Sequence, residues 1–284
     1  MKRHTLLFAF LLLISCIAAG VGAQWFIARY ERWAVYYGAA LPYDTFAAYD
    51  TLAFDSDAYP DFSDRKREGQ IILGYLSTSE AEEYRTYYGD IAAMDVFLQP
   101  SEAWDAHTVI DIRKQEWQDY FVNTLVPRVL AKGFDGIMLD TIDTPLYLEA
   151  EHPEAFAGMR EAAIRLIKAV RAAHPEAKLM LNRGFPILSD IAEDVDYVLA
   201  ESILVNYNSG DPRYFPQEIY DEYTAALTNA KKENPDLKVM TLDYWDMAPT
   251  GRQEIRRIYA RQRSHGFIPY VTTIDLSHHH EEPL

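Results

Sequence analysis

The chain has 284 residues, of which 49% are hydrophobic and 25% are charged, and this composition excludes a disordered or fibrous protein. Its net charge of −16 excludes the basic surface by which proteins bind nucleic acid. The charge would suit a cationic substrate, although solubility alone is the simpler interpretation. Cys16 is the only cysteine, which excludes an internal disulfide and leaves the rest of the chain without a thiol nucleophile.

The amino-terminal segment, residues 1–23, has the order of a secretory signal: basic residues, a long apolar run, and small residues that end at Ala23. We expect cleavage after Ala23 and export to the periplasm or the cell exterior. Two alternatives stay open: the run could remain as a membrane anchor, because about 18 apolar residues suffice for a span, or the chain could be a lipoprotein attached through Cys16. The segment carries two positive charges and no negative ones, so cleavage would change the net charge from −16 to −18. Residues 24–32 are expected to be a linker.

From residue 33 onward, short apolar runs of strand length alternate with longer helical patterns. The expected strands are Trp33–Tyr37, Thr51–Asp55, Gln70–Leu76, Thr108–Ile112, Gly136–Asp140, Lys178–Asn182, Asp196–Glu201, Lys238–Tyr244 and Phe267–Val271. The expected helices are Ser79–Tyr88, Lys114–Ala131, Glu154–His174, Pro216–Lys232 and Thr250–Ser264.

This alternation predicts a parallel sheet, and the absence of a glycine-rich phosphate-binding motif favours a barrel over a nucleotide-binding open sheet. We therefore predict an α/β fold, a single-domain TIM-type (β/α)8 barrel over residues 33–277. Such a barrel needs eight strands, so one of the nine runs is an extra strand or not a strand. Residues 278–284 contain three consecutive histidines, which lack the spacing of metal ligands, so we expect a flexible tail and neither a metal nor another cofactor.

The carboxyl ends of the predicted strands carry many polar residues, and barrel enzymes place their active sites there. Asp140 and Glu201 each close an apolar run. Glycoside hydrolysis needs two carboxyl groups beside one bond, and we interpret these two residues as that catalytic pair. A structural role is the alternative at each position, because an Asp at a strand end often caps a loop or forms an ion pair.

The remaining candidates are polar or aromatic residues at other strand ends, which could position a sugar. They are Asp55, Tyr75, Asp111, Asp143, Arg183, Tyr244 and Tyr270. Three of them also have structural interpretations: Asp111 could pair with an arginine, Asp143 could cap a turn, and Arg183 could hold a carboxylate in place.

Several segments resemble a known family. The blocks Gly74–Arg85 (GYLSTSEAEEYR) and Gly133–Asp143 (GFDGIMLDTID) resemble two blocks of the endo-α-1,4-polygalactosaminidases, glycoside hydrolase family 114. Asn182–Phe185 is similar to a block in the hydrolase domain of the Pel-polysaccharide protein, a related barrel, and Trp33–Gly38 and Val198–Ser202 also fit. The block that ends at Asp143 is the most specific of these.

The resemblance implies an exported hydrolase of α-1,4-linked, partly deacetylated galactosamine polysaccharide of a biofilm or wall matrix, a cationic partner. It also implies that Asp140 and Glu201 are the catalytic pair. We take Asp140 as the nucleophile and Glu201 as the general acid/base, with the reverse assignment open. One departure is Ser79, which stands where the family commonly has glycine. The alternatives are a carbohydrate-binding barrel without turnover in polysaccharide export, or a hydrolase of another amino-sugar glycan.

Overall fold

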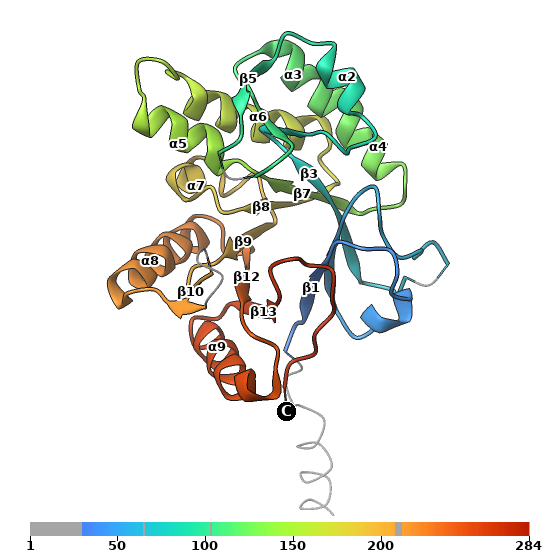
Figure 1. The fold of residues 1–284 in the computed structure, drawn as a ribbon, viewed down its shortest axis with the longest axis vertical. Helices are drawn as coiled ribbons and strands as arrows, with labels where there is room; N and C mark the ends of the chain where they lie inside the picture. The colour runs from blue at the N-terminus through green and yellow to red at the C-terminus, as the bar shows by residue number, and fades with distance from the viewer. Residues whose placement is uncertain (1–29, 65, 103, 208–211, 284) are drawn as a thin grey trace, which may run out of the picture. The chain divides into compact units, whose positions relative to one another are not determined.

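Eight parallel strands form one sheet that curls into a barrel, which confirms the predicted fold class (Figure 1). Their order in the sheet is their order in the chain: β1 (Trp33–Tyr36), β2 (Thr51–Phe54), β3 (Ile71–Ser77), β7 (Gly136–Asp140), β8 (Lys178–Asn182), β9 (Tyr197–Glu201), β12 (Lys238–Tyr244) and β13 (Ile268–Thr272). The computed structural model describes residues 30–64, 66–102, 104–207 and 212–283, and the barrel belongs to one compact unit that begins at Arg32. The expected signal, Cys16 and most of the expected linker lie outside the described residues.

The two ends of the sheet, β1 and β13, meet through side chains and loops. The ring of Trp33 in β1 lies edge-on to that of Tyr270 in β13, with centroids 5.9 Å apart. Just beyond the strands, the Tyr37 N–H donates to the Leu276 carbonyl over 2.7 Å. These contacts bring the sheet nearly to closure, so the carboxyl ends of all eight strands share one mouth.

Helices cover the outside of the barrel (Figure 1). They are α2 (Tyr88–Ala92), α3 (Gln115–Tyr120), α4 (Val126–Leu130), α5 (Asp143–Glu151), α6 (Met159–Ala173), α7 (Leu188–Ile191), α8 (Gln217–Glu233) and α9 (Arg252–Ser264), with a π-helical turn (Phe121–Leu125) joining α3 to α4. Four of the five expected helices are confirmed, with shifted ends; α6, for example, begins at Met159. None of the helices in the described part of the chain is long and apolar enough to span a membrane.

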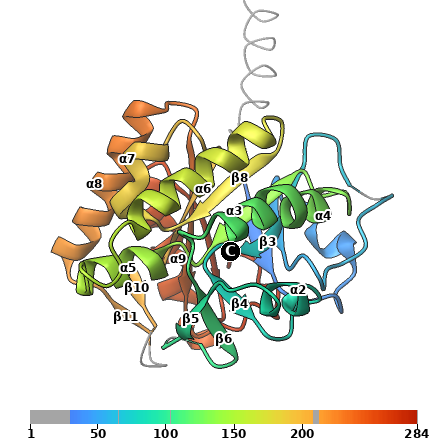
Figure 2. The same cartoon turned by 90° about the horizontal axis from the view of Figure 1, so that it is seen from above.

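The predicted run Thr108–Ile112 is the ninth strand that does not belong to the barrel. It forms β6 (His107–Ile110) of a separate antiparallel sheet with β4 (Glu80–Glu82) and β5 (Phe97–Pro100) (Figure 2). A second small pair, β10 (Val205–Asn206) with β11 (Arg213–Tyr214), follows β9. Both small sheets follow the carboxyl ends of barrel strands, so they border the mouth.

The predicted helix Ser79–Tyr88 is wrong, because its first residues form β4 and only its last residue enters α2. The serine that was expected to cap the helix is used elsewhere: its hydroxyl donates to the Thr141 carbonyl over 2.5 Å, and its N–H donates to the Thr141 hydroxyl over 3.1 Å. Glu80 and Glu82, which resemble the acidic first turn of a helix, are buried instead.

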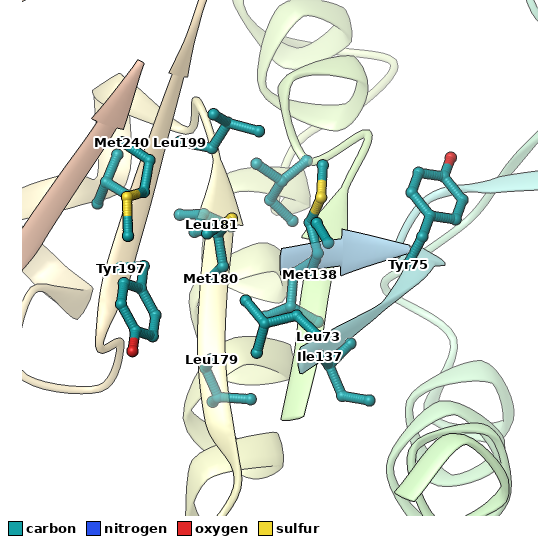
Figure 3. Packing of buried hydrophobic residues seen from close by; sticks show 14 of the residues in the cluster. Leu73, Tyr75, Ile137, Met138, Leu179, Met180, Leu181, Tyr197, Leu199 and Met240 are labelled. Carbon is teal, nitrogen blue, oxygen red and sulfur yellow. The ribbon is translucent and has the colours of Figure 1, made fainter. Parts of the chain in front are cut away.

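Apolar side chains of neighbouring strands fill the space between strands and helices (Figure 3). The residues of the inner strands β7, β8 and β9 are nearly all buried, which explains why their runs are apolar without alternation. In β8 the first residue, Lys178, is partly exposed, whereas in β7 and in β9 only the last residue is. These two residues are Asp140 and Glu201.

The block before Asp140 is mostly structural. Gly133 adopts a φ of +96°, a left-handed conformation that favours glycine. The ring of Phe134 packs edge-on against Phe62 at 5.1 Å. The Asp135 carboxylate accepts a 2.7 Å hydrogen bond from the Ile72 N–H of the neighbouring strand, which fixes the register of β7 against β3.

Gly136 completes this block, and its contact generates a prediction. A Cβ atom there would lie 1.8 Å from the Lys178 carbonyl oxygen in β8, where the backbone cannot move aside. We expect Gly136→Ala to lower the free energy of unfolding by about 3 kcal/mol or more. Gly89→Ala is the matched control, because a Cβ on Gly89 in α2 meets nothing within 4 Å, and it should be neutral or slightly stabilising. Urea denaturation of both variants measures the difference; equal stabilities would contradict the tight contact.

Candidate active site

Three consecutive barrel strands each end in a residue of one hydrogen-bonded constellation. Asp140, Asn182 and Glu201 are the last residues of β7, β8 and β9. The Asn182 Nδ2 donates to Asp140 Oδ1 over 2.8 Å and to Glu201 Oε2 over 2.6 Å. The distance between Asp140 Oδ1 and Glu201 Oε2 therefore cannot exceed the sum of these two hydrogen-bond lengths.

The backbone turns sharply after each of these residues. Thr141, Arg183 and Ser202 follow them directly and have φ angles of 63°, 58° and 51°, which non-glycine residues rarely adopt. Such a conformation costs on the order of 1–3 kcal/mol and persists only where surrounding bonds enforce it. Here the Arg183 N–H donates to the Leu199 carbonyl and the Ser202 N–H to the Leu242 carbonyl, each over 2.8 Å. The turns lead the chain away from the mouth and leave the three side chains there.

Asp140 has a raised proton affinity. Burial, and then the charge of Glu201, raise the pKa of Asp140 to about 7, against which the hydrogen bond from Asn182 acts. Glu201 accepts a second hydrogen bond on Oε1 from the Tyr244 hydroxyl. Near neutral pH Asp140 in the free protein is therefore about half protonated.

Tyr37 lies among four carboxyl groups, although sequence reasoning did not select it. Burial raises its pKa well above the ordinary value, and so do Asp140, Glu201, Asp55 and Glu82 in turn. It therefore remains a neutral hydroxyl. Its position directly after an apolar run was the signal that could have identified it.

Two of the sequence candidates, Asp55 and Tyr75, belong to a buried ionic network beside the pair. Arg85 donates through Nη1 to both oxygens of Asp55, over 2.9 and 2.7 Å, and through Nε to Glu82. The Tyr75 hydroxyl donates to Glu82 over 3.0 Å, and its ring contacts that of Tyr37 at 5.2 Å. Sequence reasoning missed Glu82 and Arg85 because it placed them on a helix surface.

Asp143 and Arg183 form an ion pair on the outer side of the constellation. Arg183 Nε donates to Asp143 Oδ2 over 2.6 Å, and Nη1 donates to the Glu201 carbonyl over 2.7 Å. The guanidinium also lies over the rings of Phe185 and Tyr223. Arg183 thus holds the backbone of Glu201 and the first residue of α5.

The structure does not bring Asp111 and Tyr270 into this constellation. Asp111 follows β6, outside the barrel sheet, and its carboxylate accepts from Arg113 Nε and Nη2 over 2.8 and 2.9 Å. The Tyr270 hydroxyl accepts from the His280 N–H over 3.3 Å, so this tyrosine packs under the carboxyl-terminal segment instead of facing the mouth. That segment also carries Glu282, which pairs with Arg263 through two 2.6 Å bonds.

Over the described residues, no cluster of His, Cys, Asp and Glu side chains is arranged to hold a metal ion.

Asp243 is a buried carboxyl group one residue before Tyr244. Its Oδ1 accepts from the Leu204 and Val205 N–H groups over 3.3 and 3.0 Å, and its Oδ2 accepts from Gln262 Nε2 over 2.7 Å. It therefore ties the loop after Glu201 to β12 and α9.

A parallel barrel whose mouth holds an Asp/Glu pair within reach of one bond is the arrangement of a barrel glycoside hydrolase. The chain belongs to glycoside-hydrolase family GH114, whose family model matches residues 17–282. Its structure is similar to the glycoside hydrolase domain of PelA from Pseudomonas aeruginosa, with a TM-score of 0.75, 23% identity, and coverage of 88% of this chain and 98% of that domain. It is also similar to Ega3 of Aspergillus fumigatus, solved in complex with galactosamine, with a TM-score of 0.63, 16% identity, and coverage of 89% and 95%. At these identities the structural likeness establishes the fold.

Two relatives in sequence are uncharacterized proteins. One from Thermotoga maritima is 24% identical over 73% of this chain and 67% of its own length. The other, MJ1477 from Methanocaldococcus jannaschii, is 24% identical over 74% of this chain and 63% of its own length. The chain therefore spans about two thirds of these relatives.

The coupling of the pair predicts that Glu201→Gln lowers the pKa of Asp140. Removing the neighbouring charge removes the second-largest cause of the raised pKa. Burial remains, so the pKa should fall from about 7 but stay above its ordinary value. Carbon-13 NMR of the aspartate carboxyl groups measures this, with Asp111→Asn as the control that leaves Asp140 unchanged. An unchanged Asp140 titration in Glu201→Gln would rule out the coupling.

The raised pKa of Asp243 predicts that the protein becomes less stable as the pH rises. Burial raises the pKa of Asp243 in the native protein to about 6, whereas an aspartate in an unfolded chain has a pKa of about 4. The contribution of the protonated Asp243 carboxyl group to the free energy of unfolding is complete below about pH 4. It is lost as the pH rises through about 6, which lowers the free energy of unfolding by about 2–3 kcal/mol. Urea unfolding across this range should show the loss in the wild type and a smaller one in Asp243→Asn. Parallel curves for the two proteins would contradict it.

Proposed function

We propose that this glycoside hydrolase is exported and cleaves α-1,4-linked, partly deacetylated galactosamine polysaccharide with Asp140 and Glu201. The observation that carries the proposal is the shared amide of Asn182, which brings the two carboxyl groups to one point of the mouth. Export is supported by the signal-like order of residues 1–23.

The separation of the pair supports a retaining mechanism. Retaining glycosidases hold their carboxyl groups about 5–5.5 Å apart, and inverting enzymes need about 6.5 Å or more to admit a water molecule. Bonds of 2.8 and 2.6 Å to one nitrogen keep Asp140 Oδ1 and Glu201 Oε2 within the shorter of these separations. One carboxylate then attacks the anomeric carbon while the other protonates the departing oxygen, and the second group later deprotonates the water that releases the sugar.

We assign the attack to Asp140 and the proton transfers to Glu201. In the free protein burial and Glu201 favour the proton on Asp140. A sugar ammonium group beside Asp140 lowers the cost of ionising it. The assignment thus couples binding of a cationic substrate to the ionised form of Asp140 that a nucleophile requires.

The charges around the mouth also support a cationic sugar. Asp140, Glu201, Asp55 and Glu82 surround Tyr37, and Arg85 is the cation that the described residues place against two of them. This excess of carboxylates favours an ammonium group over a neutral acetamide. The galactosamine bound to Ega3 belongs to the same class of sugar.

Replacing either carboxyl group should abolish hydrolysis. We expect Asp140→Asn and Glu201→Gln each to lower kcat on purified, partly deacetylated galactosamine polysaccharide by about 10²–10⁴-fold or more, because each removes one half of the acid/base and nucleophilic chemistry. Oligosaccharide release measures this. The matched control is Asp111→Asn, which removes a carboxylate that pairs with Arg113 outside the constellation and should retain activity.

The same assay reports mechanism and specificity. NMR should show that the first product keeps the α configuration. For Asp140→Ala, added azide should restore cleavage of an activated glycoside and give a glycosyl azide of inverted configuration. Full N-acetylation of the polymer or high salt should weaken cleavage. Binding without products by well-folded wild type would instead indicate a carbohydrate-binding barrel, and cleavage of a different glycan would indicate another amino-sugar specificity.

A further inference from the structure

Two large, exposed aromatic side chains lie against one residue of the small sheet that follows β3. Tyr84 is 65% exposed and Trp104 is 56% exposed. They flank one residue, His107, with ring centroids 6.0 and 6.3 Å from the imidazole. The antiparallel pairing of Glu82 with His107 explains this, because it places the segment after β4 next to the segment before β6. Single exposed apolar residues are ordinary, but here two exposed rings share the imidazole as a neighbour, at interplanar angles of 53° and 33°. We call Tyr84, Trp104 and His107 together the aromatic floor.

A buried carboxylate lies beneath this floor. Glu80 Oε2 is 3.1 Å from the Nδ1 of His107, and Oε1 accepts a 2.7 Å hydrogen bond from the Thr144 hydroxyl. Burial would raise the pKa of Glu80, but the hydrogen bonds from His107 and Thr144 outweigh it and hold the pKa below its ordinary value. The floor therefore rests on a fixed negative charge that the carboxyl pair does not use.

The floor is joined to the catalytic constellation on two sides. The Tyr84 hydroxyl donates over 3.0 Å to the same Glu82 oxygen that accepts from Tyr75. On the other side, Thr144 lies in the first turn of α5, four residues after Asp140. These connections place the floor on the rim of the mouth, beyond the carboxyl pair on its Asp140 side.

We propose that Tyr84, Trp104 and His107 form a rim subsite for one amino-sugar unit of the polymer, remote from the bond that is cleaved. The apolar C–H face of a pyranose packs on indole and phenol rings. The sugar ammonium is attracted both by the ring faces and by the charge of Glu80 below them. This subsite rests on the proposed function, and it gives longer chains a contact that short ones cannot reach.

The test measures binding rather than cleavage, so that it does not depend on turnover. Glu201→Gln serves as the parent protein, and α-1,4-linked galactosamine oligosaccharides of increasing length are titrated by calorimetry. In the parent, the affinity should rise with length until the chain reaches the rim. Adding Trp104→Ala should remove that rise and weaken the longest oligosaccharide by about tenfold, whereas Trp104→Phe should keep most of it. Ile219→Ala, which removes an exposed apolar side chain on α8, is the control that should keep it entirely.

The outcomes separate the two proposals. If Trp104→Ala binds every length as the parent does, or if the parent shows no gain with length, the rim subsite is wrong even where the wild type hydrolyses the polymer. If the gain is present and depends on Trp104 but the wild type releases no products, the subsite stands on a binding barrel and the hydrolase proposal fails. If the affinity for fully N-acetylated oligosaccharides rises with length as much as the affinity for galactosamine oligosaccharides does, the role given to Glu80 is wrong.

Discussion

The site depends on one side-chain amide that donates to two acids. Two carboxyl groups so close together repel each other, and burial makes the repulsion stronger. The two hydrogens of Asn182 Nδ2 offset part of this by serving both groups at once. That arrangement depends on the register of three neighbouring strands. Leu139 of β7 pairs with Leu181 of β8, so Asp140 and Asn182 end these strands side by side, whereas Asn182 pairs with Leu199, so β9 runs two residues further to Glu201. The register of the barrel is therefore a condition of the chemistry.

Strain and buried polar groups accumulate where this register has to be held. The left-handed turns at Thr141, Arg183 and Ser202 come directly after the three site residues. Each is enforced by bonds to a neighbouring strand or loop, and Arg183 additionally holds the carbonyl of Glu201. The Asn182 Oδ1 is buried and has no hydrogen-bond partner within the described structure, a cost that the orientation of its amide toward the carboxylates imposes. Such costs are typical of a site whose geometry is fixed by the fold rather than by its own stability.

The sequence predicts the barrel well because strands buried on both faces appear as short, continuous apolar runs. Helices buried on one face appear as apolar residues at the helical period. It also points to Asp140 and Glu201, since a carboxylate that ends an apolar run is visible without any structure. It fails for β4, because an acidic segment after a serine has the pattern of a helix start, while backbone pairing with β6 and the bonds of Glu80 to His107 and Thr144 bury this segment as a strand. Asp111 and Tyr270 fail for another reason, since their polar atoms bond to groups nearby in the chain, Arg113 and His280, and not to groups at the mouth.

The segment between β3 and β7 contains the wrongly predicted helix Ser79–Tyr88, the candidate Asp111 that lies outside the constellation, and the aromatic floor. One face of it turns Glu82 and Arg85 toward Asp55 and Tyr75, and the other exposes the aromatic floor above Glu80. The barrel strands on either side are paired directly, β3 with β7. The two ends of the segment support this pairing, because Asp135 bonds to Ile72 in β3 and Ser79 bonds to Thr141 directly after Asp140. On the function and the rim subsite proposed above, catalytic geometry belongs to the barrel strands and the contact with longer substrates belongs to the segment between β3 and β7. That segment is also the part of the chain where local patterns predict structure least well.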